Sequence, residues 1–283
     1  MLQLIRRILR IHWPYWAARI PGLLRNRPVV KGVTVSLTTH GIRMDTVHGA
    51  IYSILRGSVV PEYLVLVLNS EPKSAVAIRS IERLKRHGLK VLIAPNFGPH
   101  TKYFPVVMQA DRPLDILVTA DDDIFYPRNW LERLVQTHRQ YSEDVICWWA
   151  KEMRMENGNL LSYHAWPNAA TFEADRSNFA LGVGGVLYPH SMIRALRVAA
   201  TGFLTCCARA DDIWLHAVAL RSGHKIRPIV CTFTWPVMIP DTQEGGLNHT
   251  NHLPEGNDLQ MAATYSQLDL RALQEAIASR ARR

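Results

Sequence analysis

The stretch Leu114–Pro127, LDILVTADDDIFYP, joins an apolar run to three consecutive aspartates. Residues 115–120 have the aliphatic and β-branched composition of a buried strand. Three like charges directly after such a strand repel one another unless a cation lies between them. The stretch therefore predicts a strand that ends in a site for a positively charged ligand.

Segments with strand and helix patterns alternate before this stretch. Strands are predicted over residues 33–38, 63–69, 89–95 and 115–120, with helices over 46–56, 70–88 and 104–110. This alternation is typical of a parallel sheet with helices on both faces. In such sheets, ligands bind at the carboxyl ends of the strands. We therefore expect an α/β fold with the three aspartates at its ligand site.

The three aspartates are themselves candidate metal ligands. Side chains alternate along an extended chain, so Asp121 and Asp123 are expected to point the same way. Carboxylate oxygens are ligands that Mg²⁺ and Mn²⁺ prefer, and these ions keep positions open for substrate phosphates. The alternative is that the aspartates cap a helix over residues 126–138, but one aspartate is enough for a cap. The pattern favours a divalent-cation site.

A second acidic pair, Asp211 and Asp212, begins a helical segment that ends at Gly223. One interpretation is a general base, because a carboxylate partly withdrawn from water can take a proton from an alcohol. The other is an N-terminal cap with a favourable interaction with the helix dipole. The spacing alone does not decide between them.

Three further segments hold candidate ligand contacts. Glycines at 182, 184 and 185 would allow a ligand close to the backbone, although a turn or a strand bulge explains them equally well. Lys102 is a candidate partner for a phosphate. His249, in a late loop with a second histidine, is a candidate metal ligand, with a solvent-exposed loop as the alternative.

Taken together, these motifs resemble the GT-A glycosyltransferases, most of all the family-2-like enzymes of bacterial surface-polysaccharide assembly. The resemblance spans roughly residues 33 to 235 and is carried, in order, by VTVSLTTHGIRMDTVHGAIYSIL, LVLN, HTKYF, DILVTADDDIFYP, GVGGVLYP and ADDIWLHAVALRSGHKI. It implies a GT-A (Rossmann-like) fold, with a mostly parallel sheet flanked by helices in a single catalytic domain. The chain departs from the family at LTTH, where PTYN is usual, and at LNSEP, which lacks the usual acid.

The resemblance also implies a reaction and a set of roles. A sugar would pass from a nucleoside-diphosphate sugar, a UDP-sugar by expectation, to a hydroxyl of a glycan or lipid-linked acceptor, with inversion. Mn²⁺ or Mg²⁺ would be bound by Asp123, and either Asp211 or Asp212 would be the base. His249 lies beyond the segment that the resemblance covers and stays a candidate further ligand on its residue type alone. The other implied contacts are Thr38, Arg43, Lys102, Asp121 and Asp122 with the nucleotide, and Gly184, Gly185 and Tyr188 with the donor sugar or acceptor.

Charge and length divide the 283-residue chain into three parts. Residues 1–30 form a basic amphipathic segment, residues 31–240 the catalytic domain, and residues 241–283 a C-terminal loop and helix that complete the site. The first 28 residues hold six arginines and no acid, so we expect a segment on an anionic membrane surface, a helix packed on the domain, or a solvated arm. No apolar run approaches the roughly 20 residues of a bilayer span. We expect a cytoplasmic protein, peripheral at the inner face of the membrane.

Other classes of protein fit the sequence less well. The net charge of +9 comes without a nucleic-acid-binding motif, so nucleic acid is not an expected partner. The four cysteines show no CxxC spacing and are expected to be reduced thiols. Two alternatives to a glycosyltransferase remain: another Mg²⁺- or Mn²⁺-dependent phosphate-transfer enzyme, and a non-catalytic glycan-binding protein of the same fold.

Overall fold

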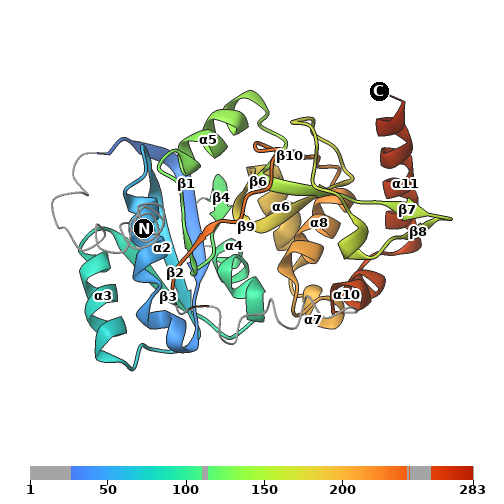
Figure 1. Ribbon diagram of the computed structural model, residues 1–283. Coiled ribbons are helices and arrows are strands. Elements are labelled where there is room, and N and C mark those ends of the chain that lie inside the picture. Colours follow the sequence, from blue (N-terminus) through green and yellow to red (C-terminus); the bar gives the residue numbers. More distant parts are fainter. Residues whose placement is uncertain (1–26, 110–113, 241, 243–255, 283) are drawn as a thin grey trace, which may run out of the picture.

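The computed structural model describes residues 27–109, 114–240, 242 and 256–282 (Figure 1). The strands are β1 (Val29–Thr38), β2 (Val60–Leu68), β3 (Leu89–Ile93), β4 (Ile116–Thr119), β5 (Ile124–Phe125), β6 (Val145–Glu152), β7 (Met155–Glu156), β8 (Asn159–Leu160), β9 (Asn178–Tyr188), β10 (Ile226–Pro228) and β11 (Val237–Met238). The α-helices are α2 (His48–Leu55), α3 (Ala75–Lys85), α4 (Phe104–Met108), α5 (Trp130–Gln140), α6 (His190–Ala199), α7 (Phe203–Cys206), α8 (Asp211–Arg221), α10 (Gly256–Thr264) and α11 (Gln267–Ala281). Short 3-10 helices are η2 (Gly41–Asp45), η3 (Gly98–Lys102) and η4 (Tyr163–Ala165).

A seven-stranded sheet in the order β10-β6-β9-β4-β1-β2-β3 forms the centre of the molecule. Strands β4, β1, β2 and β3 run parallel to one another, as predicted from the alternating pattern. Strand β9 is antiparallel to both β4 and β6. The predicted α/β architecture, a mostly parallel sheet flanked by helices, is confirmed.

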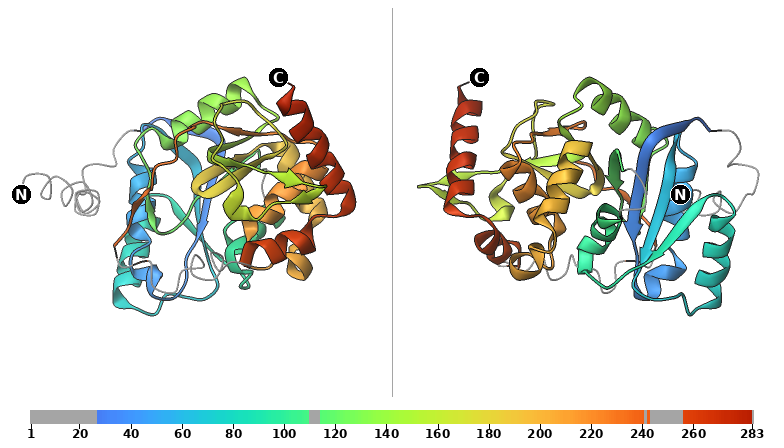
Figure 2. Two further views of the ribbon diagram at one scale, coloured as in Figure 1. Left: turned by 45° about the vertical axis from the view of Figure 1, so that its right-hand side comes forward. Right: turned by 180° about the vertical axis from the view of Figure 1, so that it is seen from behind.

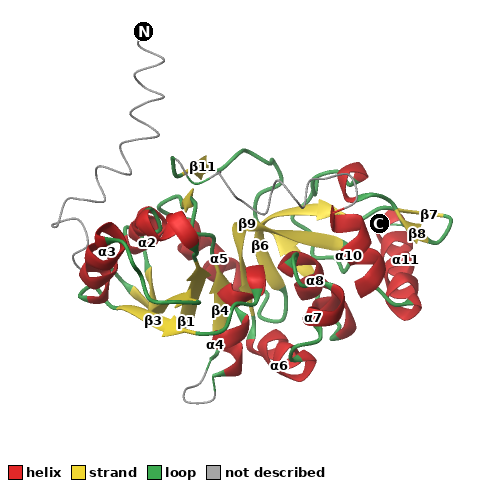
Figure 3. Cartoon of the chain, turned by 90° about the horizontal axis from the view of Figure 1, so that it is seen from below, coloured by secondary structure: helices red, strands yellow, loops and turns green. Residues whose placement is uncertain are grey.

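Helices cover both faces of this sheet. Figure 3 shows α2 and α3 on one side of the strands and α4 and α6 on the other. Helix α3 illustrates why these segments are helical: Ser74 caps it by accepting a hydrogen bond from the Ala77 amide, and apolar residues recur along one face. Gly88, at a φ of +93°, follows its end. Because β1, β2 and β4 run parallel, the loops that follow them lie at the same edge of the sheet.

The glycine-rich segment around residue 184 is a long strand, β9, and the predicted bulge lies within it. Gly185 has a φ of +87°, and a Cβ atom there would lie 2.4 Å from Cζ2 of Trp130. The Trp130 indole N–H donates to the Gly184 carbonyl oxygen at 2.8 Å. The glycines therefore let α5 pack closely on β9, which is a structural role.

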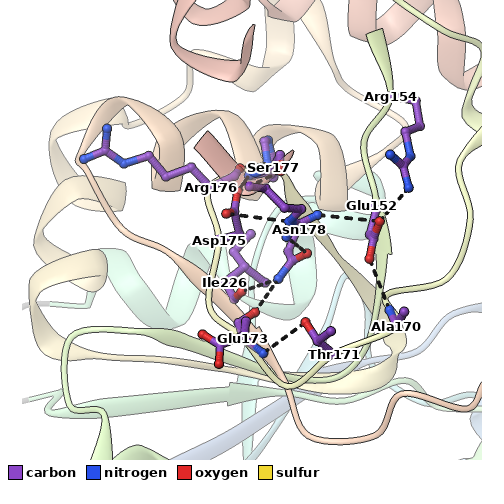
Figure 4. Close-up of polar contacts among 12 residues, drawn as sticks. Glu152, Arg154, Ala170, Thr171, Glu173, Asp175, Arg176, Ser177, Asn178 and Ile226 are labelled. Atoms are coloured by element: carbon purple, nitrogen blue, oxygen red, sulfur yellow. Dashed lines mark hydrogen bonds and ion pairs between the residues drawn. The ribbon is translucent and has the colours of Figure 1, made fainter. Parts of the chain in front are cut away.

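The C-terminal helix α11 lies beside α8, and an ion pair joins the two helices (Figure 2). Arg221, at the end of α8, forms a 2.8 Å ion pair with Asp269, which also closes the capping box of α11 with Ser266. In the last turn of α11, Arg280 donates to the Asn178 side-chain oxygen at 2.5 Å. Figure 4 shows Asn178 at the centre of this polar network, with its amide group donating to the Ile226 carbonyl. These contacts stabilise the position of α8, which carries Asp211 and Asp212 in its first turn.

The predicted division into three parts stays a prediction. Strand β1 begins at Val29, and residues 1–26 of the basic segment lie outside the described residues. Within the described ranges, no helix combines the length and apolar character that crossing a bilayer requires. All four cysteines are free thiols, as expected.

Candidate active site

A cavity of about 440 Å³ opens at the carboxyl ends of β1, β2 and β4, where the fold predicts ligand binding. It gathers residues from both acidic clusters and from the loops after three strands. The side chains that line it include Thr38, Thr39, Arg43, Asn69, Asn96, Lys102, Asp121, Asp122, Asp123, Arg209, Asp211, Asp212 and Met238. The predicted nucleotide contacts and both predicted base candidates therefore share one cavity.

The three aspartates do not lie along an extended strand. Strand β4 ends at Thr119, and Asp122 and Asp123 form a turn before β5. Strand alternation therefore does not set the directions of Asp121 and Asp123, but both residues line the cavity and lie close enough for the charge of Asp121 to raise the pKa of Asp123. The capping alternative also fails, since α5 begins at Trp130 without a side-chain cap. The aspartates are presented to the cavity instead.

Arg43, in η2, contacts the turn. Its Nη1 atom lies 3.0 Å from Oδ1 of Asp122 and 3.3 Å from Oδ2 of Asp123. Burial is the largest cause that raises the pKa of Asp123 to about 7, with the charges of Asp121 and Asp122 adding to it. Arg43 therefore compensates only part of the negative charge that this turn collects.

Lys102 connects the two acidic clusters. Its ammonium group lies 2.9 Å from Oδ1 of Asp121 and 3.0 Å from Oδ2 of Asp211, and only 9% of its side chain is exposed. Burial opposes the charge on Lys102, but the surrounding aspartates outweigh it and hold its pKa well above the usual value. Lys102 therefore stays positively charged between two carboxylates that come from distant parts of the chain.

Replacing Lys102 by methionine is expected to lower the free energy of unfolding by about 3 kcal/mol at pH 8, because two partly buried carboxylates lose their counter-charge. The loss should shrink towards pH 5, where the carboxylates left without a counter-charge can take up a proton. Chemical denaturation at both pH values measures it. Lys85→Met, on the exposed face of α3, is the matched control and should change little. An equal loss in both variants would contradict the buried role of Lys102.

Asp211 and Asp212 occupy the first turn of α8, and neither is its N-cap residue, which is Ala210. Asp212 accepts a hydrogen bond from the Gly182 amide at 3.0 Å, and a Cβ at position 182 would lie 2.6 Å from its Oδ1. Burial first, and the charge of Asp211 second, raise the pKa of Asp212 to about 7. Asp211 is the carboxylate paired with Lys102. The two neighbours therefore differ, with Asp212 having the basicity suited to proton transfer near neutral pH.

The raised pKa of Asp212 makes a prediction about stability. Its carboxyl group binds a proton in the folded chain between about pH 4 and pH 7, where the unfolded chain has released it, so this group's contribution to stability falls as pH rises through that window. Asp212→Asn removes the titration. Its stability relative to wild type should rise by about 2 kcal/mol from pH 5 to pH 8. Denaturant unfolding at several pH values tests this, and a pH-independent difference would contradict it.

The cavity has a charge that suits a divalent cation, although the described residues do not by themselves form a complete set of metal ligands. Among the described residues, no three His, Cys, Asp or Glu side chains converge on a single metal position. Five aspartates nevertheless line the cavity together with Arg43, Lys102 and Arg209, so negative charge is in excess. Hard carboxylate oxygens with a raised pKa at Asp123 match the chemistry of Mg²⁺ or Mn²⁺. The donor set therefore fits such an ion together with oxygens supplied by a substrate.

Other predicted site residues lie elsewhere. Gly184 lines a second, aromatic cavity on the other side of Val183, while Gly185 packs against Trp130. Tyr188 is buried in the core and lines neither of these two cavities. His249 lies outside the described residues. Gly184, Gly185 and Tyr188 therefore do not line the acidic cavity, whereas Gly182 does.

Sequence reasoning missed several residues that line the acidic cavity. Asn69 follows directly after β2, and Asn96 comes soon after β3. A polar residue just beyond the carboxyl end of a parallel strand is the signal that would have found both. Arg209 and Met238 carry no such signal, because long-range packing brings them to the cavity.

Comparisons with known proteins agree with this architecture. No family model matches the sequence, and the search of curated proteins also finds no match. The structure is similar to that of S. aureus TarS 1–349 in complex with UDP, at 14% identity and a TM-score of 0.50, covering 70% of this chain and 58% of that one. The mannosyltransferase PcManGT from Pyrobaculum calidifontis in complex with GDP-Man and Mn²⁺ is 14% identical with a TM-score of 0.48, over 98% of this chain and 85% of that one. The chain thus spans 58% of the TarS structure that it matches, and it has the GT-A fold expected from its motifs.

Proposed function

We propose that this chain is a metal-dependent, inverting glycosyltransferase that transfers a sugar from a nucleoside-diphosphate sugar to an acceptor hydroxyl. One observation carries the proposal: two aspartate clusters, joined by Lys102, face one cavity at the carboxyl ends of the parallel strands. One cluster has the charge to hold a cation with a diphosphate. The other holds a carboxylate with the pKa of a base.

The donor lies in the acidic cavity, with its nucleotide near Thr38, Arg43, Lys102, Asp121 and Asp122. These residues come from the first strand, from η2 and η3, and from the turn after β4. Lys102 is positioned to contact the diphosphate because it already sits between the two clusters. We propose a UDP-sugar as the donor. The likeness to the UDP complex of TarS is consistent with this choice.

Asp123 would hold the cation, either Mn²⁺ or Mg²⁺, with His249 as a further proposed ligand. When bound, such an ion stabilises the negative charge that develops on the departing nucleoside diphosphate. Arg43 remains beside Asp122 and Asp123 and limits the repulsion within the turn. This division of roles explains why the carboxylates of the turn outnumber Arg43, the arginine that contacts them.

Asp212 is the proposed base. It takes the proton from the acceptor hydroxyl as that oxygen forms a bond to the anomeric carbon of the donor sugar. The bond between the anomeric carbon and the diphosphate breaks, and the nucleoside diphosphate leaves with the electron pair. Attack from the side opposite the leaving group inverts the configuration. The Gly182 amide orients Asp212 by donating to its carboxylate.

The proposed acceptor is a glycan or a lipid-linked saccharide at the inner face of the membrane. The arginine-rich N-terminal sequence, which has no acidic residue in its first 28 positions, supports a location at an anionic surface. The N-terminal sequence bears on the location of the acceptor, and the chemistry of the site determines which acceptor is bound.

A panel of nucleoside-diphosphate sugars with Mn²⁺ tests the proposed function, with release of nucleoside diphosphate as the readout. We expect release from at least one donor, and none with EDTA in place of Mn²⁺. Release of free phosphate or pyrophosphate would instead indicate another phosphate-transfer enzyme. Binding of glycan without release from any donor would indicate a non-catalytic relative.

A further inference from the structure

A second cavity, of about 470 Å³, lies beside the acidic one and differs from it in chemistry. Its walls are aromatic and apolar, with Trp130, Trp148, Trp149 and Trp235 among the lining residues. Trp235 is 79% exposed and offers a flat face on which a sugar ring can pack, whereas Trp130, Trp148 and Trp149 are buried and leave little of their rings open to a ligand. The cavity therefore has the lining of a saccharide site and none of the carboxylates of its neighbour.

The two cavities adjoin along β9. Val183 lines both, while Gly182 lines the acidic cavity and Gly184 the aromatic one. Two residues of strand span roughly 7 Å, which is about the length of one sugar unit. A saccharide in the aromatic cavity can therefore extend a hydroxyl towards Asp212, whose carboxylate accepts from the Gly182 amide.

A group of arginines borders the aromatic cavity. Arg56 and Arg128 line it, and backbone contacts explain why they are close: the Ser58 amide donates to the Arg128 carbonyl at 2.7 Å. Arg27 joins them because the Val60 amide donates to the carbonyl of Pro28 at 2.9 Å. Three segments that are distant in the sequence thus bring arginine side chains together beside the aromatic cavity.

These arginines are not compensated within the described part of the chain. No carboxylate there lies within ion-pairing distance of Arg27, Arg56 or Arg128. Burial and the charges of Arg27 and Arg128 lower the pKa of Arg56, as expected for like charges held together. The Nε atom of Arg27 is buried without a hydrogen-bond partner among the described residues. Arginines that were simply dispersed over a solvated surface would not be expected to gather beside one cavity in this way.

We propose that the aromatic cavity binds the acceptor, and that this acceptor is a saccharide that carries a phosphate group. The sugar ring packs on Trp235, and the phosphate lies on Arg56 and Arg128, whose planar guanidinium groups pair well with phosphate oxygens. The inference rests on the proposed function and names the chemical class of its acceptor.

The test compares hexose 1-phosphates with the matching methyl glycosides on the full chain, with UDP and Mn²⁺ present to fill the acidic cavity. Ligand-observed NMR measures both affinities. We expect the phosphate to improve affinity at least tenfold, and Arg56→Gln/Arg128→Gln to abolish that preference. Arg83→Gln/Arg86→Gln, on the exposed surface around α3, removes the same charge and should keep it. Trp235, which is 79% exposed, can be replaced by alanine without risk to the core, and this should weaken both ligands alike.

The outcomes separate this inference from the proposed function. If UDP with Mn²⁺ binds but phosphate brings no preference, or neither hexose ligand binds, the acceptor class is wrong. A preference that survives in Arg56→Gln/Arg128→Gln also overturns it. If UDP with Mn²⁺ does not bind, while the hexose 1-phosphate still depends on Arg56 and Arg128, the phosphate site stands and the proposed transfer falls.

Discussion

Asp212→Asn is expected to lower the rate of sugar transfer by roughly 10² to 10⁴, the range over which general-base catalysis contributes. The amide cannot take a proton from the acceptor hydroxyl, but its oxygen can still accept from the Gly182 amide, so the cavity keeps its shape. Steady-state kinetics with the best donor measure the rate. Nucleoside-diphosphate affinity should stay within about threefold of wild type, because the effect lies in the chemical step.

Two further variants sharpen this test. Asp115→Asn, on an exposed residue before β4, makes the same chemical change away from the cavity and should leave transfer unchanged. Asp211→Asn disturbs the ion pair with Lys102, so its main effect should be on stability. Full activity of Asp212→Asn, or a larger loss of kcat in Asp211→Asn, would show that Asp212 is not the base.

Asp123→Asn is expected to abolish the thermal stabilisation that a nucleoside diphosphate gives in the presence of Mn²⁺. A ligand at a hundred times its dissociation constant stabilises a protein by about 2.7 kcal/mol. For a domain of this size, that corresponds to a rise in Tm of roughly 5 to 10 °C. The rise should be absent in Asp123→Asn and absent in wild type with EDTA. A variant that retains it would remove Asp123 from the metal site.

The sequence predicts the architecture well because local patterns determine it. The four strands through residue 120 and the helices between them follow from hydrophobic periodicity, and the residues after each strand fall at one sheet edge. Gly88 marks the end of the helix predicted over residues 70–88, but α3 begins only at Ala75, because Ser74 is its N-cap. The placement of both acidic clusters in one cavity follows from the same logic and from the resemblance to GT-A glycosyltransferases.

Long-range contacts account for what the sequence did not predict. Arg43 reaches Asp122 across 79 residues, and Lys102 reaches Asp211, so the partners of the carboxylates are set by tertiary packing. The turn at Asp122 and Asp123 replaced the expected extended geometry because β4 stops at Thr119. The glycines near position 184 fit the Trp130 ring, a contact that no local pattern indicates.

A crystal structure of the full chain with UDP and Mn²⁺, with anomalous scattering used to locate manganese, tests the central claim most directly. The account predicts one manganese peak within bonding distance of an Asp123 oxygen and of the diphosphate, with Asp212 facing the position of the donor sugar across the same cavity. Manganese bound away from Asp123, or a nucleotide bound outside the acidic cavity, would contradict it.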